Sequence, residues 1–250
     1  MHTVAIIQAR MTSTRLPGKI LADIAGRPLL YHVVNRARQA RLFDLVTVAT
    51  TDRPTDDPTE DCCRRLGVPC FRGSETDVLD RFYRAAEASR AEVVARLTAD
   101  CPLLDPPVID SVVGMLRDGG LDYVSNTRPP TFPDGLDVEA MKRETLGRAW
   151  REAQLPSERE HVTPYIWKQP EMFRLGNVAN DKDYSKMRWT VDEPADLEFV
   201  RRVYAHFGAD ARFGMPEIVA LLEKEPEIQL VNAGFERNEG YEKSLKEDNR

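Results

Sequence analysis

The sequence predicts an α/β fold in which a mostly parallel sheet is flanked by helices. Three short apolar runs, residues 4–7, 45–49 and 93–97, alternate with longer segments whose apolar residues recur at helical spacing. This alternation of strands and helices is typical of doubly wound sheets. The chain has 250 residues, of which 42% are hydrophobic, and this is enough to bury a large core in one domain.

The predicted elements follow each other in order along the first half of the chain. Residues 29–40 carry apolar side chains at i, i+3, i+4 and i+7, which predicts a helix that buries one face. Residues 59–66 are expected to form a helix that ends at Gly67, and residues 106–117 a helix that begins with proline. Further strands are expected at residues 68–71 and 122–125, and a further helix at residues 78–90.

The rhythm changes after about residue 127, where turn-forming residues gather. Strands are predicted at residues 136–141, 173–178 and 187–191, and helices within residues 145–154, 156–169, 196–207 and 216–223. We therefore expect a single α/β domain over residues 1–231, with an inserted substrate or dimerisation lobe at about residues 128–170. The polar residues 232–250 are expected to form a tail with a frayed or disordered end.

Composition and charge exclude several classes of protein. The net charge of -6 argues against broad binding of nucleic acid or anionic membranes. The four cysteines lack the paired spacing of a zinc site, so reduced and mostly buried thiols are expected. No apolar stretch is long enough for a signal peptide or a membrane span, which makes the cytoplasm the default expectation.

A basic loop, residues 9–19, directly follows the first predicted strand. It holds Arg10, Arg15 and Lys19 together with three hydroxyl residues and Gly18. Arginine binds phosphate through bidentate hydrogen bonds, lysine adds a point charge, and backbone N–H groups complete such a site. Because open α/β sheets bind ligands at the carboxyl ends of their strands, this loop is predicted to hold a nucleoside triphosphate. A solvated basic loop explains the same residues, since the Walker A and G-x-G-x-x-G spacings are both absent.

Two aspartates also follow predicted strands. Asp100 comes after residues 93–97, and Asp192 comes after residues 187–191. Two carboxylates at strand ends can share Mg²⁺, which otherwise takes phosphate oxygens and water as ligands. Each aspartate alone can also be explained as the cap of a following helix. The occurrence of both beside a basic loop favours a metal–triphosphate site.

Two further segments hold candidate substrate-binding residues. If residues 136–141 form a strand, Asp137 and Glu139 point to one face and can bind substrate hydroxyls, although a solvent-facing edge strand is an equal alternative. Ser157 and Glu160 have the spacing of a helix capping box. That interpretation leaves Arg159 and His161 unexplained, and both are candidates to meet an anionic or hydroxylated substrate.

The loop at residues 72–77, with Arg81 after it, is the last candidate. Its alternative interpretation is an ordinary loop in which Ser74 or Thr76 caps the next helix.

Several of these stretches together carry a family resemblance. Residues 8–19, 48–52, 72–74, 100–103 and 191–197 resemble the motifs of cytidylyltransferases that activate acidic sugars, the CMP-Kdo and CMP-sialic acid synthetases. Residues 98–103, 134–139 and 157–165 are similar to the SpsF-like branch of spore coat polysaccharide biosynthesis. The resemblance covers about residues 3–207 and includes residues 237–241. One departure is Thr98-Ala99, which stands where the CMP-Kdo enzymes have Gln-Gly.

The resemblance implies a Rossmann-like, GT-A-like nucleotidyltransferase fold, CTP under the basic loop, Mg²⁺ as cofactor and a homodimer. The residues that it implies as catalytic are Arg15, Lys19, Asp100 and Asp192, of which the two aspartates would bind the metal. Those implied for nucleotide binding are Ala9, Arg10, Ser13, Arg15, Lys19, Arg72, Ser74 and Thr98. Those expected to bind the substrate are Asp134, Asp137, Glu139, Arg159 and His161.

The predicted reaction joins CMP from CTP to a hydroxyl of a sugar or acidic sugar and releases pyrophosphate, in surface polysaccharide or glycan biosynthesis. Such transfer depends on positioning and charge neutralisation more than on covalent catalysis, and no general base stands out in the sequence. A glycosyltransferase that consumes a nucleotide sugar is an alternative, although the sequence at Asp100 is not the D-x-D expected of it. A non-catalytic nucleotide-binding protein is a third possibility.

Overall fold

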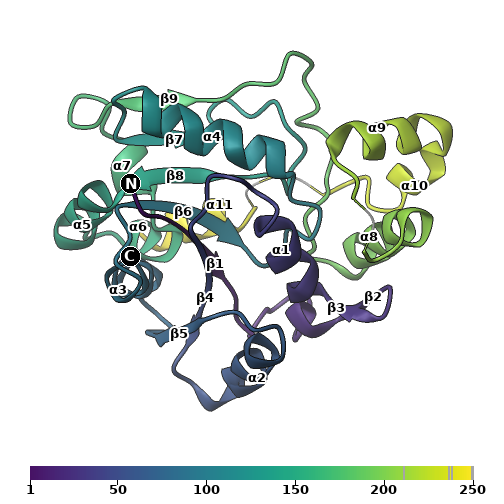
Figure 1. Ribbon diagram of the computed structural model, residues 1–250, viewed down its shortest axis with the longest axis horizontal. Helices are drawn as coiled ribbons and strands as arrows, with labels where there is room; N and C mark the ends of the chain where they lie inside the picture. The colour runs from purple at the N-terminus through teal and green to yellow at the C-terminus, as the bar shows by residue number, and fades with distance from the viewer. Residues whose placement is uncertain (211, 236, 238, 249–250) are drawn as a thin grey trace.

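The computed structural model describes residues 1–210, 212–235, 237 and 239–248. Its centre is a seven-stranded sheet with helices on both faces (Figure 1). In spatial order the strands are β5 (Cys70–Gly73), β4 (Leu45–Thr51), β1 (Thr3–Gln8), β6 (Val93–Thr98), β8 (Glu139–Lys142), β7 (Tyr123–Ser125) and β9 (Leu175–Asn177). A small separate hairpin is formed by β2 (Asp23–Ile24) and β3 (Arg27–Pro28).

The α-helices connect these strands and then continue beyond the last one. In chain order they are α1 (Leu29–Ala37), α2 (Asp57–Arg65), α3 (Val78–Ala88), α4 (Pro106–Asp118), α5 (Arg143–Glu152), α6 (Pro156–His161), α7 (Pro164–Trp167), α8 (Pro194–Phe207), α9 (Met215–Lys224), α10 (Pro226–Leu230) and α11 (Glu239–Glu247). Two short 3₁₀ helices, η1 (Lys19–Leu21) and η2 (Pro54–Asp56), follow β1 and β4.

The sheet is mostly parallel, which confirms the predicted fold class. The strand β1 pairs in parallel with both β4 and β6, and β4 pairs in parallel with β5. Two antiparallel pairings, β6 with β8 and β8 with β7, interrupt the pattern. Because β8 lies in the middle of the sheet, residues 128–170, expected as an inserted lobe, also contribute a strand to the central layer.

Alternation along β1 explains why the sheet is covered on both faces. Ala5 and Ile7 belong to the apolar cluster formed with α1, α4 and α8, whereas Val4 and Ile6 belong to the cluster formed with α3 and α5. All four of these side chains are fully buried. A strand buried on both faces needs a continuous apolar run, which is what residues 4–7 provide.

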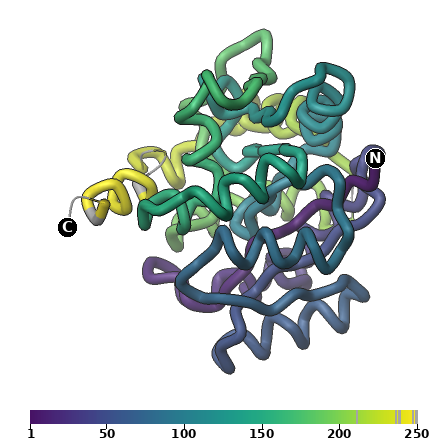
Figure 2. Tube along the Cα trace, turned by 90° about the vertical axis from the view of Figure 1, so that its left-hand side faces the viewer, coloured from purple at the N-terminus to yellow at the C-terminus, as the bar shows by residue number. Residues whose placement is uncertain are grey.

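Three local predictions in the second half of the chain are wrong. Residues 156–169 form two short helices instead of one, because the backbone of Val162 adopts a positive φ of 72° between α6 and α7. Residues 187–191 form no strand and contribute only a bridge between Asp134 and Arg188. The segment expected to be a frayed tail contains helix α11, which packs on α6 and extends beyond the main body (Figure 2).

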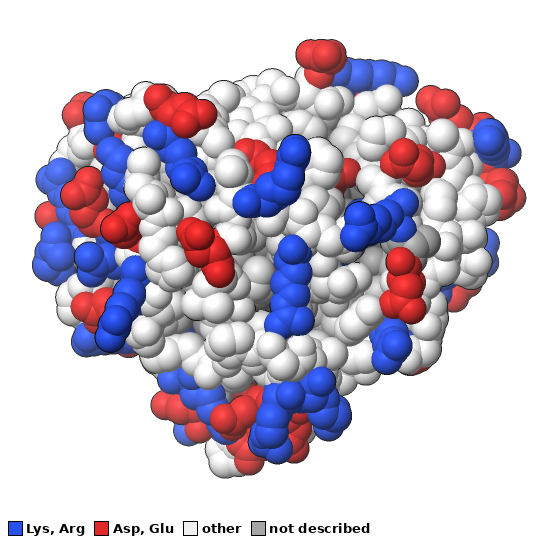
Figure 3. Space-filling model, in the orientation of Figure 1, with Lys and Arg blue, Asp and Glu red and all other residues white. Residues whose placement is uncertain are grey.

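Charged side chains of both signs are interspersed over the face of the molecule seen in Figure 3. Among the described residues, no helix has the length and apolar character needed to cross a bilayer.

Candidate active site

A cavity of about 730 Å³ lies at the carboxyl ends of β1 and β6. The chain places β4 and β5 on one side of β1 and then crosses to place β6 on the other side. Such a reversal of strand order leaves a crevice where α/β sheets bind ligands. The residues that line this cavity include Ala9, Arg10, Ser13, Arg15, Lys19, Arg96, Thr98, Asp100, Asp134, Asp137, Glu139, His161, Trp167, Arg188, Asp192 and Tyr241.

The basic loop folds back on itself at the carboxyl end of β1. The backbone N–H groups of Ser13 and Gly18 both donate to the Met11 carbonyl at 3.0 Å, and Gly18 adopts a left-handed φ of 72°. The Met11 N–H in turn donates to the Asp56 carboxylate at 2.7 Å, which ties the loop to η2. Lys19, at the end of the loop, is only 8% exposed, so the interpretation as a solvated loop is wrong for this residue.

Lys19 joins the two aspartates that were predicted to bind a metal. Its Nζ lies 3.1 Å from Asp100 Oδ2 and 2.7 Å from Asp192 Oδ1, and it also donates to the Val191 carbonyl at 2.8 Å. Arg15 places a second cation 3.0 Å from Asp192 Oδ2. The two carboxylates therefore face one position, where they can bind a cation.

The neighbouring charges fix the ionisation of this group. Burial raises the pKa of Asp100, but the Lys19 ammonium and a hydrogen bond from Thr98 outweigh it and lower the pKa to about 2. Burial lowers the pKa of Lys19, and the carboxylates of Asp100 and Asp192 raise it above its ordinary value. At neutral pH the site therefore holds an ionised Asp100 and a protonated Lys19.

Two converging carboxylates fit a Mg²⁺ site that is completed by phosphate oxygens and water. Over the described ranges, no cluster of three or more His, Cys, Asp and Glu side chains is arranged to hold a metal. The alternative of a helix cap fails for Asp100, because α4 is capped by Asp105, which accepts from the Val108 N–H at 3.2 Å. For Asp192 it also fails, because Glu193 is the residue at the cap position of α8.

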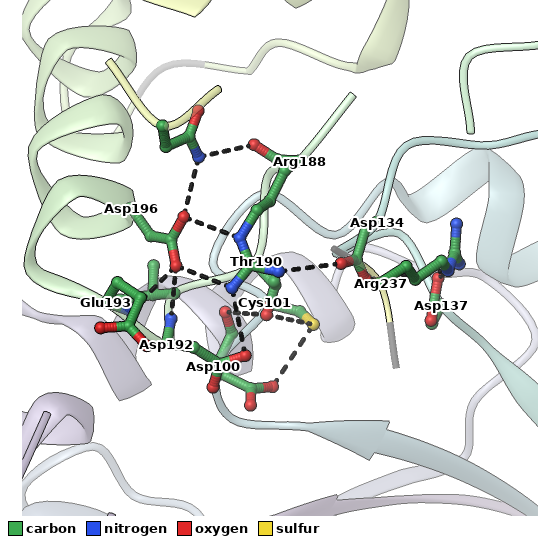
Figure 4. A network of polar contacts seen from close by, with 12 residues as sticks. Asp100, Cys101, Asp134, Asp137, Arg188, Thr190, Asp192, Glu193, Asp196 and Arg237 are labelled. Carbon is green, nitrogen blue, oxygen red and sulfur yellow. Dashed lines mark hydrogen bonds and ion pairs between the residues drawn. The ribbon is translucent and has the colours of Figure 1, made fainter. Parts of the chain in front are cut away.

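Asp192 is held in place by a buried ion pair at the start of α8 (Figure 4). Two nitrogens of Arg188 each lie 2.9 Å from an oxygen of Asp196, and the same carboxylate accepts from the backbone N–H groups of Asp192 and Glu193 at 2.9 Å. Arg188 also lies 3.4 Å from Asp192 Oδ2. Asp196 is fully buried, so this network fixes the backbone from which Asp192 projects.

A second pair of aspartates, Asp134 and Asp137, lines the same cavity beside Arg237. Arg237 forms a close ion pair with Asp137, and its Nε lies 3.9 Å from Asp134. Burial and the neighbouring Asp137 raise the pKa of Asp134 to about 7, and burial also raises the pKa of Asp137. Between them, Gly135 has a φ of 110° and lies so close to Trp189 and Thr190 that a Cβ would meet the Thr190 nitrogen at 2.5 Å.

Glu139 is buried in the wall of the cavity, so the solvent-facing interpretation of this segment is wrong. Its carboxylate accepts hydrogen bonds from the hydroxyls of Tyr123 at 2.5 Å and Thr163 at 2.6 Å, and pairs with Arg96. Burial raises the pKa of Glu139, but Arg96 and these hydroxyls outweigh it and lower the pKa below its ordinary value. Glu139 is thus an ionised group with its hydrogen bonds directed to the protein.

His161 also lines the cavity, as predicted for a substrate-binding residue. Its Nε2 lies 3.0 Å from the hydroxyl of Ser244 in α11. Burial and the positive charge of Arg96 lower the pKa of the imidazole. The predicted capping box next to it is wrong, because Ser157 donates to Asp248 and the Glu158 carboxylate, not Glu160, accepts from the backbone at the helix start.

Three predicted site residues lie outside the lining of this cavity. Arg72 binds the carboxylates of Asp57 and Glu60, at 2.7 and 2.8 Å. The Ser74 hydroxyl accepts from the Asp77 N–H, and Ser74 lines a separate cavity of about 650 Å³. The guanidinium of Arg159 is occupied by Asp77, at 2.6 and 2.8 Å, and by two backbone carbonyls. The sequence placed all three in the site by motif, whereas ion pairs hold Arg72 and Arg159 elsewhere and a local hydrogen bond from Asp77 fixes Ser74.

Other cavity residues were not predicted. Arg96 lies inside a strand that looks apolar, and Trp167 belongs to a segment without a charge motif. Tyr241 belongs to residues 237–241, which were singled out by resemblance but not assigned to the site. Asp196, which supports the cavity residue Arg188, had a detectable signal, since an acid at the third position of a helix that begins with proline accepts backbone N–H groups.

Comparisons with known proteins agree with this geometry. Residues 4–225 match a family model described as cytidylyltransferase. The spore coat polysaccharide biosynthesis protein SpsF of Bacillus subtilis is 35% identical over 228 residues, which cover 89% of this chain and 94% of that protein. A 3-deoxy-manno-octulosonate cytidylyltransferase of Anaeromyxobacter is 40% identical over 130 residues, 51% of this chain and 52% of that protein. The structure of a cytidylyltransferase from Leptospira borgpetersenii superposes with a TM-score of 0.88 at 32% identity, covering 95% of this chain and 100% of that one.

Proposed function

The chain belongs to the cytidylyltransferase family of CTP-dependent nucleotidyltransferases, and we propose that it transfers CMP from CTP to a hydroxyl of a sugar or sugar acid. The observation that carries the proposal is the contact of one ammonium, that of Lys19, with both Asp100 and Asp192 beneath the basic loop. This arrangement provides cationic groups for a triphosphate and two carboxylates for the metal that accompanies it.

The reaction forms a bond between the acceptor oxygen and the α-phosphorus of CTP. The bond from the α-phosphorus to the β-phosphate oxygen breaks, pyrophosphate leaves with that electron pair, and the hydroxyl proton passes to solvent. Arg10, whose guanidinium is unpaired among the described residues, lines the cavity together with Ser13. These two side chains and the loop N–H groups would hold the triphosphate, while Arg15 and Lys19 neutralise the departing pyrophosphate.

Asp100 and Asp192 are the residues that would hold Mg²⁺, which supplies positive charge at the phosphate groups when it is bound. The low pKa of Asp100, about 2, keeps this ligand ionised throughout the physiological pH range. Arg188 and Asp196 act on the same group by fixing the backbone of Asp192. The protein's own contribution is thus to hold the carboxylates and the basic loop at one point.

The names of two relatives support a sugar or sugar acid as the acceptor and a role in polysaccharide synthesis. One is a 3-deoxy-manno-octulosonate cytidylyltransferase, and the other is a protein of spore coat polysaccharide biosynthesis. We therefore infer an acceptor that is a sugar or sugar acid, and a role in the synthesis of surface polysaccharide or glycan. A cytoplasmic homodimer is part of the same proposal, and light scattering of the purified chain tests its oligomeric state.

The test measures pyrophosphate release from CTP and Mg²⁺ with a panel of sugars and sugar acids, with ATP, GTP and UTP in parallel. We expect CTP to be preferred, and Asp100→Asn to lower kcat about 10³-fold, because it removes one of two charges that bind the metal. Asp61→Asn is the matched control, since Asp61 is exposed on α2 and paired only locally with Arg64 at 2.6 Å. Unchanged turnover in Asp100→Asn, or release of a nucleoside diphosphate, would contradict the proposal.

A further inference from the structure

The end of the chain runs along the cavity and is anchored to it at several points. We call the described residues between 232 and 248 the C-terminal strap. Near its start, the Asn232 side chain donates to Asp196 at 2.9 Å and to the Arg188 carbonyl at 3.0 Å. Arg237 then pairs with Asp137 and donates to the Phe132 carbonyl at 3.2 Å. The strap thus contacts both the network that supports Asp192 and the second pair of aspartates.

Helix α11 fastens the far end of the strap to α6. The Ser244 hydroxyl lies 3.0 Å from His161 Nε2 and 2.7 Å from the Glu160 carboxylate. One residue past the helix, Asp248 accepts from the backbone N–H of Ser157 at 2.9 Å and from its hydroxyl at 2.6 Å. These contacts hold α11 beside α6, on the side of the molecule where Figure 2 shows the chain end.

The strap contributes four residues to the lining of the cavity. Gly240, Tyr241, Lys243 and Ser244 all line it. The Tyr241 ring packs edge-on against the rings of His161 and Trp167, with centroids 5.1 and 5.8 Å away. Within the described part of the chain, the buried Tyr241 hydroxyl has no hydrogen-bond partner. A buried hydroxyl without a partner is costly, which suggests that a ligand group completes its hydrogen bonding.

Helix α11 of the strap lies at a different wall of the cavity from the groups proposed to bind the nucleotide, although Asn232 at the start of the strap contacts Arg188 and Asp196. The proposed phosphate and metal ligands lie on the basic loop, at the end of β6 and at Asp192, whereas α11 packs on α6 and its Tyr241 contacts Trp167 of α7. The family match ends at residue 225, so the strap lies outside the matched residues, although residues 237–241 take part in the resemblance to the SpsF-like branch. An element outside the shared core is suited to select the substrate that differs among family members.

We propose that the C-terminal strap forms the acceptor subsite, in which Tyr241 and Lys243 contact the acceptor sugar. This inference rests on the proposed transfer of CMP. The Tyr241 ring offers an apolar surface to the C–H face of a sugar ring, while the Trp167 ring already carries the Arg128 guanidinium 3.2 Å from its centroid. The Tyr241 hydroxyl and the exposed Lys243 ammonium offer hydrogen-bond donors to its hydroxyl or carboxylate oxygens.

The test compares Tyr241→Phe and Lys243→Gln with the wild-type chain, using the acceptor of the panel with the highest pyrophosphate release. Each variant is expected to raise the acceptor KM about fivefold, by loss of one hydrogen bond to the sugar, and to leave the CTP Kd within about twofold. Lys246→Gln is the matched control, because Lys246 is exposed on the same helix and does not line the cavity. Sugar acids and neutral sugars form separate arms, and a KM effect of Lys243→Gln confined to sugar acids identifies a carboxylate contact.

Two outcomes overturn the inference: an acceptor KM that is unchanged in both variants, or a CTP Kd that rises as much as the acceptor KM. Failure of the proposed function differs, because the wild-type chain then binds CTP and releases no pyrophosphate with any acceptor. In that case the panel is tested for binding to the CTP-loaded chain by saturation-transfer NMR. Binding lost in Tyr241→Phe supports the acceptor subsite, and absence of binding to the wild type overturns it.

Discussion

Asp100 and Asp134 are partly buried aspartates of the same cavity, but their neighbours shift their pKa values in opposite directions. The ammonium of Lys19 lies 3.1 Å from Asp100 and helps to lower its pKa to about 2. Asp134 lies beside a second acid, Asp137, and burial and this neighbour raise the pKa of Asp134 to about 7 although Arg188 and Arg237 are near. The comparison shows that nearby cations alone do not determine the pKa of a carboxylate. Burial and neighbouring carboxylates raise the pKa, and the sum of these effects and the effect of the cations determines ionisation.

The cations of the two groups also come from different parts of the chain. Lys19 follows β1 closely and is part of a compact motif, whereas Arg237 lies 100 residues from its partner Asp137. The metal group is therefore built from η1 after β1, the end of β6 and the segment before α8, and the second group is completed by the C-terminal strap. We expect the first group to serve the shared chemistry and the second to serve the choice of acceptor.

The largest effect is expected from Lys19→Ala, which removes the cation common to Asp100 and Asp192. We predict a fall in kcat of about 10²–10³-fold, because two neighbouring carboxylates lose their shared counter-charge and the leaving pyrophosphate loses a ligand. Steady-state pyrophosphate release measures the change, and circular dichroism checks that the fold is retained. Lys224→Ala, at an exposed position near the end of α9, is the control. A kcat within threefold of the wild type would remove Lys19 from the catalytic group.

A smaller effect concerns stability and pH at Asp134. Its pKa in the fold, about 7, is above that of an unfolded aspartate, near ~4, so the folded chain binds more protons between these values. The contribution of Asp134 to stability is therefore predicted to fall by about 1–3 kcal/mol as the pH rises from 4 to 7, and Asp134→Asn should remove this part of the pH dependence. Urea unfolding at several pH values measures it.

The pKa of Asp100 is shifted in the opposite direction from that of Asp134, so Asp100 serves as the internal comparison. Its pKa in the fold, about 2, is lower than in the unfolded chain, so its contribution is present above pH ~4 and is lost as the pH falls toward 2. Asp100→Asn should change the slope between pH 4 and 7 less than Asp134→Asn does, because the Asp100 charge is only a minor cause of the raised pKa of Asp134. An equal slope in wild type and Asp134→Asn would mean that another group titrates in that range.

The sequence was most informative where one short stretch of residues determines both a secondary-structure element and the functional side chains next to it. The apolar run of β1, the basic loop and the two aspartates after predicted strands were all assigned from neighbouring residues, and the structure brings these groups into one cavity. The pairing of Lys19 with both aspartates could not be predicted, since 81 and 173 residues separate it from them. Ion pairs at such separations depend on the register of the sheet.

The second half of the chain shows where such inference fails. This half contains the antiparallel β8, the break between two helices at Val162 and the folded strap. None of these three features is predicted by a strong pattern in the neighbouring residues. The strap is polar and short, so composition alone suggested disorder. Its order comes from tertiary contacts, such as those of Asn232 with Asp196 and of Asp248 with Ser157. A polar segment is stabilised here by hydrogen bonds that become available only after the core has formed.

The smallest effect is expected from Arg72→Gln. Arg72 was assigned to the nucleotide site from a sequence motif, but the structure places it outside the cavity, so this variant tests which of the two locates the site correctly. The Arg72 guanidinium binds Asp57, Glu60 and the carbonyls of Thr51 and Arg53, outside the main cavity. We predict kcat and the CTP KM within about twofold of the wild type and a loss of stability of about 1 kcal/mol or less, since these ion pairs are partly exposed.

Arg15→Gln is the matched comparison for Arg72→Gln, because the same change is made at an arginine that lines the cavity and lies 3.0 Å from Asp192. Loss of one charged contact to a phosphate there is expected to raise the CTP KM about tenfold or more. If both variants raise the CTP KM equally, the motif located Arg72 correctly, and the ion pairs with Asp57 and Glu60 must then open when the nucleotide binds. If only Arg15→Gln does so, the tertiary ion pairs of Arg72 are structural, and the nucleotide site is limited to the cavity at the ends of β1 and β6.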